Sequence, residues 1–109
     1  MEFLNYKNKP IAYRVLGEGQ PLVLLHGFCE DSSIWDEVIN SIDAQIICID
    51  LPGFGQSELV TDLTIPKMAD IVAAVLDHLK INKCIMIGHS MGGYVSLAFA
   101  QKYLSLIHI

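Results

Sequence analysis

Short continuous apolar runs alternate with helical patterns along this chain, and that alternation restricts its fold more than any other feature. Residues 22–26 (LVLLH), 45–50 (QIICID) and 84–88 (CIMIG) have the length and apolar character of strands buried on both faces. Strands that alternate with helices form parallel sheets through right-handed crossovers, with helices packed on the sheet faces. We therefore predict an α/β protein with a mostly parallel sheet.

Two further strands are predicted near the N-terminus. Residues 2–7 and 11–17 have β-like patterns, and the turn formers Asn8 and Pro10 lie between them. This arrangement favours a β-hairpin ahead of the parallel strands.

Helical patterns fill the connections between the later strands. Residues 34–42 form the first candidate helix, with Ser33 as its N-cap. Residues 65–79 carry an apolar stripe at the spacing of a helix face, and Thr64 is placed to cap it. Residues 91–103 are apolar on nearly all sides, which predicts a helix buried against the sheet.

Composition and charge exclude several classes of function. The 109 residues allow one small domain, and 52% of them are hydrophobic, which is ample for a core. The formal net charge is −5 and no basic stripe is visible, so we expect no nucleic-acid partner. No apolar run approaches the roughly 18 residues that span a bilayer. The N-terminus also lacks a secretory signal, so we expect a cytoplasmic protein without a membrane partner.

Three cysteines show neither disulfide nor zinc-site spacing. Cys48 and Cys84 lie inside apolar runs, so we interpret them as core residues. Cys29 follows a possible site loop and is a candidate for contact with a substrate. No metal ligand set is expected.

The most specific motif is GHSMGG at residues 88–93, which matches G-x-S-x-G. It lies between a predicted strand and a predicted helix, which is the context that a nucleophile elbow requires. Gly88 and Gly92 remove side chains that would clash in a sharp turn, and Ser90 is then exposed beside the free N–H groups of the helix start. The alternative, a helix-capping serine in a glycine-rich turn, explains Ser90 but not the glycines.

Three motifs together resemble the α/β-hydrolase fold family. LLHGF at 24–28 resembles that family's oxyanion loop, DLPGFGQS at 50–57 the loop after its fourth strand, and GHSMGG its nucleophile elbow. They occur in the family's order and spacing, and the resemblance covers about residues 1–103. It implies the first five strands of the family's sheet, in the spatial order 1-2-4-3-5.

The resemblance also implies roles for individual residues. Ser90 would be the catalytic nucleophile, and the backbone N–H groups of Phe28 and Met91 would form the oxyanion hole. Phe28 and Cys29 are the candidates for substrate contact. No cofactor is implied, because the motifs are not phosphate-binding patterns. Asp50 ends a predicted strand, but in this family its position belongs to a structural turn.

The acid and the base of a catalytic triad are both missing after Ser90. In this fold the order is serine, acid, histidine, but no Asp or Glu follows Asp77, and His108 is the only later histidine. Of the earlier histidines, we interpret His26 as a structural loop residue. His78 is expected to be exposed, and His89 to have a packing role.

The last six residues, LSLIHI at 104–109, leave the helical pattern without a capping glycine. They resemble the translation of a sequencing adapter, so we expect a partial hydrolase domain at 1–103 and a non-native tail at 104–109. A natural truncation or a split gene is the alternative. The fifth strand would then be an open apolar edge, which predicts poor solubility or partial molten character.

Three functions follow from this interpretation. The first is a serine hydrolase that acts on a small ester, thioester or amide through an acyl-enzyme, with these 109 residues nearly inactive alone. The second is a lyase or C–C bond hydrolase of the same fold, similar to the menaquinone-pathway synthases. The third is a non-catalytic fragment. The partner is expected to be a small-molecule substrate, and the oligomeric state is left open.

Overall fold

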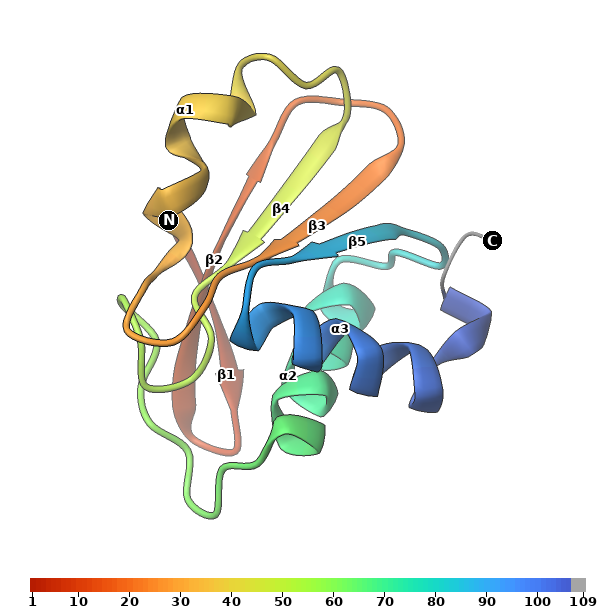
Figure 1. The fold of residues 1–109 in the computed structure, drawn as a ribbon. Coiled ribbons are helices and arrows are strands. Elements are labelled where there is room, and N and C mark those ends of the chain that lie inside the picture. The colour runs from red at the N-terminus through yellow and green to blue at the C-terminus, as the bar shows by residue number, and fades with distance from the viewer. Residues whose placement is uncertain (107–109) are drawn as a thin grey trace.

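The computed structural model describes residues 1–106. Its five strands form one sheet in the predicted order β1-β2-β4-β3-β5 (Figure 1). The strands are β1 (Glu2–Tyr6), β2 (Lys9–Leu16), β3 (Pro21–Leu25), β4 (Gln45–Ile49) and β5 (Ile85–Gly88). The predicted hairpin is confirmed by antiparallel pairing of β1 with β2. β2 is antiparallel to β4, whereas β3 is parallel to both β4 and β5.

Helices cover both faces of the sheet (Figure 1). The long helices α2 (Ile65–His78) and α3 (Met91–Lys102) pack on one face, over Val23 and Leu25 of β3. The opposite face carries Leu22 and Leu24, which pack with Trp35 and the short helix α1 (Asp36–Ile39). Because successive side chains of a strand point to opposite faces, an unbroken apolar run supplies both cores.

The prediction for α2 is confirmed in its cap and its buried face. The hydroxyl oxygen of Thr64 accepts a hydrogen bond from the N–H of Lys67 at 3.2 Å, and Pro66 lies in the first turn. The buried residues lie along one side of the helix: Met68, Ala69, Ile71, Val72, Val75 and Leu76. On another side, Asp70 accepts hydrogen bonds from Tyr103 Oη at 2.6 Å and Lys102 Nζ at 2.7 Å. These contacts tie α2 to the end of α3.

The first predicted helix was wrong in its bounds and its cap. The chain forms a 3₁₀ turn, η1 (Ser32–Trp35), followed by the four-residue α1. Asp31, not Ser33, is the N-cap, because its carboxylate accepts the N–H of Ser33 at 2.8 Å. The sequence DSS offers three successive capping residues, so pattern alone does not select among them.

The prediction that residues 91–103 form a helix packed against the sheet is confirmed, but the apolar residues on the outer side of α3 are exposed. Val95 and Phe99 are buried, but Tyr94 and Leu97 are 68% and 70% exposed. Among residues 1–106, β3, β5, α2 and the turn η2 (Leu104–Leu106) are the elements that pack against α3, which leaves its outer side uncovered. The β5 edge is uncovered as well, because β5 pairs only with β3 within the described residues.

The segment predicted to be a non-native tail is described in part. Leu104–Leu106 form η2, and the carbonyl of Leu106 accepts the N–H of Cys84 at 2.8 Å. Residues 107–109, including His108, lie outside the described residues. The origin of the tail therefore stays a prediction. Within residues 1–106 no helix has both the length and the apolar character to cross a bilayer.

Candidate functional site

Ser90 lies at the point where β5 turns directly into α3. Its backbone has φ 56° and ψ −114°, a sparsely populated region for a residue with a side chain. Such conformations typically cost about 1–3 kcal/mol and persist only where the surroundings hold them. The Ser90 side chain is exposed and caps no N–H of α3. The structure therefore does not support the alternative in which the Ser90 side chain caps the helix.

Close packing of backbone explains the glycines around Ser90. A Cβ at Gly88 would collide with the backbone of Gly92, and a Cβ at Gly92 would collide with the carbonyl oxygens of Leu25 and His26. A Cβ at Gly93, by contrast, would meet only the Gly88 oxygen at 3.6 Å, which is ordinary contact. Gly88 and Gly92 are therefore required by the turn, and Gly93 is not.

Ser90 opens into a concave surface of about 440 Å³ that is also lined by Gly93, Tyr94 and Leu97. Tyr94 and Leu97 belong to the uncovered outer side of α3. The depression is thus lined by the apolar side chain of Leu97 together with the hydroxyl-bearing side chains of Ser90 and Tyr94.

The loop after β3 reaches the same end of the sheet as Ser90, because β3 and β5 are parallel neighbours. The N–H of His89 donates to the carbonyl of Leu25 at 2.9 Å. A Cβ at Gly27 would lie 3.2 Å from both the carbonyl oxygen and Nδ1 of His89. The residues immediately before Phe28 and Ser90 are therefore in close contact.

His26 has the structural role that its sequence position predicted. The ring is completely buried, and Nε2 accepts the N–H of Leu51 at 2.9 Å. Nε2 must then be unprotonated, so Nδ1 carries the proton and donates to the carbonyl of Gly27 at 2.8 Å. The N–H of Glu30 donates to the same carbonyl at 3.3 Å. Two donors thus fix the orientation of the Gly27–Phe28 peptide.

Phe28 N–H belongs to that fixed peptide and points away from its carbonyl, as in any trans peptide. Within residues 1–106, neither this N–H nor the N–H of Met91 has a hydrogen-bond acceptor. Met91 is the first residue of α3, where backbone N–H groups lack helical partners. The Phe28 side chain is 68% exposed. Its ring packs edge to face against the ring of Phe54, with 5.5 Å between the ring centroids.

His89 makes a polar contact rather than the expected packing contact. Its Nδ1 lies 2.9 Å from Oε1 of Glu30, and the ring is 57% exposed. The same Glu30 oxygen accepts the N–H of Gly27 at 2.6 Å. The hydrogen bond from His89, and then that from Gly27, lower the pKa of the Glu30 carboxyl. Sequence reasoning missed Glu30, whose only signal was an acidic residue three positions after a glycine in a site loop.

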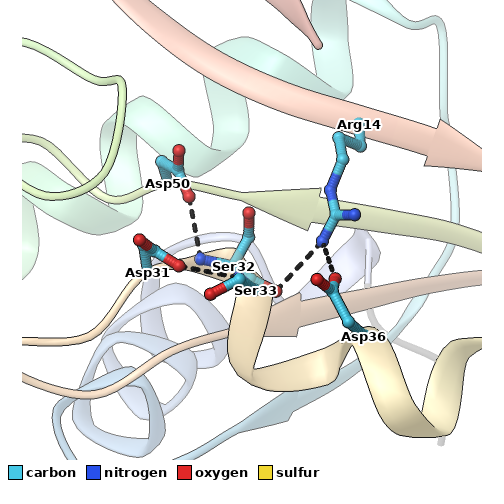
Figure 2. Close-up of polar contacts among 6 residues, drawn as sticks. All are labelled: Arg14, Asp31, Ser32, Ser33, Asp36 and Asp50. Carbon is cyan, nitrogen blue, oxygen red and sulfur yellow. Dashed lines mark hydrogen bonds and ion pairs between the residues drawn. The ribbon is translucent and has the colours of Figure 1, made fainter.

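Asp50 is a structural residue, as its position in a turn predicted. Its carboxylate is buried, and Oδ1 accepts the N–H of Ser32 at 2.8 Å, as Figure 2 shows. Oδ2 accepts the N–H of Gln56 at 3.0 Å. Figure 2 also shows Arg14, which donates to Asp36 at 2.7 Å and to the carbonyl of Ser32 at 3.1 Å. This network joins β2, the end of β4 and the start of η1.

The remaining candidates divide between core and surface. Cys48 and Cys84 are buried as predicted, and burial raises the pKa of the Cys48 thiol to about 11. Cys29 is exposed beside Phe28, with φ 60°. His78 is exposed as predicted, on α2. Among the described residues no cluster of His, Cys, Asp or Glu could hold a metal ion.

The fold and the site define an α/β protein whose serine lies on a sharp strand-to-helix turn, at the same end of the sheet as the loop after β3. That loop contains Gly27 and is called the glycine loop below. A family model for the alpha/beta hydrolase fold matches residues 20–108. The chain belongs to the α/β-hydrolase fold family, as the sequence motifs predicted.

Three curated relatives show the range of functions in the family. The acetyltransferase component of the acetoin cleaving system of Pseudomonas putida is 41% identical over 75% of this chain and 23% of its own length. The pimeloyl-acyl-carrier-protein methyl ester esterase of Aeromonas hydrophila is 32% identical over 84% of this chain and 36% of its own. The 2-hydroxy-6-oxononadienedioate/2-hydroxy-6-oxononatrienedioate hydrolase of Burkholderia vietnamiensis is 34% identical over 85% of this chain and 35% of its own length.

Solved structures agree with this assignment. A thermophilic esterase from Thermogutta terrifontis superposes with a TM-score of 0.84 and 36% identity, over 91% of this chain and 38% of its own. The chain thus spans between about a quarter and two fifths of the proteins named here. The match to the family model, residues 20–108, contains β3, β4, β5 and both site loops.

Proposed function

We propose that these residues form the nucleophile half of a serine hydrolase that acts on a small ester, thioester or amide. The polypeptide that carries residues 1–103 together with the rest of the fold is called the whole protein below. The observation that carries the proposal is the backbone of Ser90, which is held in a strained conformation with its hydroxyl exposed. The same end of the sheet carries the N–H groups of Phe28 and Met91, which have no acceptor within residues 1–106. Strain of this kind concentrates at functional sites.

The proposed reaction begins when Oγ of Ser90 attacks the carbonyl carbon of the substrate. The carbonyl oxygen becomes an oxyanion, which the N–H groups of Phe28 and Met91 would stabilise. Loss of one such donor typically costs about 3–4 kcal/mol of transition-state stabilisation. A base takes the proton of the Ser90 hydroxyl during the attack and gives it to the leaving alcohol, thiol or amine as the acyl-enzyme forms. Water, deprotonated by the same base, then attacks the acyl carbon, and the acid leaves as Ser90 regains its proton.

Attack requires a base within hydrogen-bond reach of Ser90. Among residues 1–106, both ring nitrogens of His26 are engaged by backbone, and His89 is paired with Glu30. His78 lies on α2 and interacts with Tyr13 of β2. We therefore expect the base and its acid to come from another segment, and residues 1–106 alone to be nearly inactive. Without its base, a triad enzyme retains only about 10³–10⁴-fold catalysis over water.

A second candidate is hydrolysis of a C–C bond at the same serine. It is supported by the 34% identity to the Burkholderia vietnamiensis hydrolase. The two reactions share the oxyanion hole and differ in the substrate that the rest of the fold selects. Parallel assays with a p-nitrophenyl ester and a vinylogous 1,5-diketone would distinguish them.

The decisive experiment compares Ser90→Ala with Ser41→Ala in the whole protein. Ser41 is exposed and lies at the end of α1, away from the site loops, so it serves as the matched control. Ser90→Ala should abolish hydrolysis and the covalent attachment of a fluorophosphonate, whereas Ser41→Ala should change neither. Retention of both properties by Ser90→Ala would refute the proposal. The cytoplasmic location and the small-molecule substrate remain predictions.

A further inference from the structure

Glu30 links the two loops of the candidate site through a single carboxylate oxygen. Oε1 accepts the N–H of Gly27 on the loop after β3, at 2.6 Å, and lies 2.9 Å from Nδ1 of His89 on the turn after β5. No other side chain within residues 1–106 hydrogen-bonds to both of these segments. The two segments belong to different strands, so their separation is not fixed by local chain geometry.

Glu30 also holds Gly27 from its other side. The backbone N–H of Glu30 donates to the carbonyl of Gly27 at 3.3 Å, while the carboxylate accepts the Gly27 N–H. Together with the bond from His26, these contacts fix both peptide planes of Gly27. The second plane carries the N–H of Phe28.

We propose that Glu30 is a positioning residue, which sets the direction and distance of the Phe28 N–H relative to Ser90 and Met91. This inference rests on the proposed function, because it assigns the Phe28 N–H to the oxyanion. Glu30 itself touches neither the substrate nor the reacting atoms. A misplacement of about 1 Å in an active site can cost on the order of 100-fold in rate, so the contact has a measurable effect.

The charge of Glu30 is consistent with this role. An unpaired carboxylate near a developing oxyanion would oppose catalysis, but this one is engaged by a backbone N–H and an imidazole. These two hydrogen bonds lower the pKa of the Glu30 carboxyl, so it stays ionised and acts only as an acceptor at neutral pH. His26 is the other titratable group that lowers the pKa of the Glu30 carboxyl.

The test uses the whole protein with Glu30→Ala, Glu30→Gln and the control Glu37→Ala. Glu37 is an exposed acidic residue of α1, and no hydrogen bond or ion pair of its side chain is present among residues 1–106. End-point titration with a fluorophosphonate gives the concentration of active sites, so that a loss of folded protein does not count as a loss of rate. Glu30→Ala should lower kcat about 10–100-fold with KM nearly unchanged. Its affinity for a trifluoromethyl ketone, which places an oxyanion in the hole, should fall by a similar factor.

Glu30→Gln should recover most of the lost kcat, because the amide oxygen still accepts the Gly27 N–H. Glu37→Ala should match the unmodified protein. Unchanged kcat and ketone affinity in Glu30→Ala would overturn the inference, while an inactive Ser90→Ala would leave the proposed function intact. Conversely, an active Ser90→Ala would refute the proposed function itself.

A second measurement applies if Glu30→Ala does not fold. In the unmodified protein, the Gly27 amide resonance should follow the titration of the Glu30 carboxyl, with a midpoint below the ordinary value of about 4.3 for glutamate. In Glu30→Gln this transition should disappear. A Gly27 amide that does not respond in the unmodified protein would overturn the inference.

Discussion

Gly92, in the first turn of α3, packs so close to the carbonyl oxygen of Leu25, the last residue of β3, that no side chain would fit between them. A Cβ at Gly92 would overlap this oxygen, which already accepts the N–H of His89. The contact brings the start of α3 close to the end of β3, and with it Ser90 to the glycine loop. The sequence around either residue does not predict this contact, because more than half of the chain separates Leu25 from Gly92.

Gly92→Ala should therefore destabilise the protein, and Gly93→Ala should not. The added methyl at position 92 meets fixed backbone oxygens, so we expect a loss of about 3 kcal/mol. The methyl at position 93 meets only ordinary contacts, and alanine favours a helix by about 0.5–1 kcal/mol over glycine. Urea unfolding of the two variants of the whole protein checks the difference. Equal midpoints for the two variants would contradict it.

Asp50→Ala should cost about 3 kcal/mol, because it leaves the N–H groups of Ser32 and Gln56 buried or half-buried without an acceptor. Asp50→Asn retains one acceptor oxygen and should be less harmful. Asp43→Asn, at an exposed position, is the control. In thermal unfolding, the melting temperature should be lowest for Asp50→Ala, intermediate for Asp50→Asn and highest for Asp43→Asn. An Asp50→Asn variant that lost hydrolysis without losing stability would instead indicate a catalytic role.

The Asp70 contacts predict a dependence of stability on pH. Hydrogen bonds from Lys102 and then Tyr103 lower the pKa of Asp70 in the folded state. A depressed pKa means that the stabilisation is complete above the unfolded value of about 3.9 and is lost as pH falls through the folded pKa. Asp70→Asn should lower the melting temperature at pH 7 and converge with the unmodified protein in acid.

Tyr103→Phe isolates one of those contacts. It removes the hydroxyl donor while leaving the ring against Phe99, so we expect a loss of about 1 kcal/mol near neutral pH. The melting temperatures of Asp70→Asn, Tyr103→Phe and the unmodified protein, measured between pH 3 and pH 7, test both predictions. A constant difference between Asp70→Asn and the unmodified protein across this range would disprove the pH dependence.

The β5 edge predicts self-association of the 109-residue chain. Ile85 and Ile87 are each 44% exposed on a strand that pairs on one side only within residues 1–106. Replacing both by lysine should increase the monomer fraction in light scattering, because charged edges resist pairing. Ile34→Lys, at an exposed position away from the edge, should have no such effect. A monomeric unmodified chain that unfolds cooperatively would contradict the prediction.

Sequence patterns predicted the sheet because β3 and β4 are apolar on both faces and because GHSMGG joins a strand to a helix. The strand order came from the family resemblance rather than from spacing. Patterns failed at η1, where Asp31 competes with two serines for the cap. At α3 they predicted the packing on the sheet but not which side of the helix is exposed. Glu30 was missed because its partners, Gly27 and His89, meet only when β3 and β5 pair.

The neighbouring positions of β3 and β5 have a consequence for how the site is made. Phe28 leaves the ribosome about 60 residues before Ser90, which at typical synthesis rates is an interval of about 3–12 s. During that time the glycine loop has no partner strand on the β5 side, and the Glu30 carboxylate lacks its imidazole. The two parts of the site therefore cannot come into contact during synthesis until α2 has packed on the sheet and β5 has paired with β3.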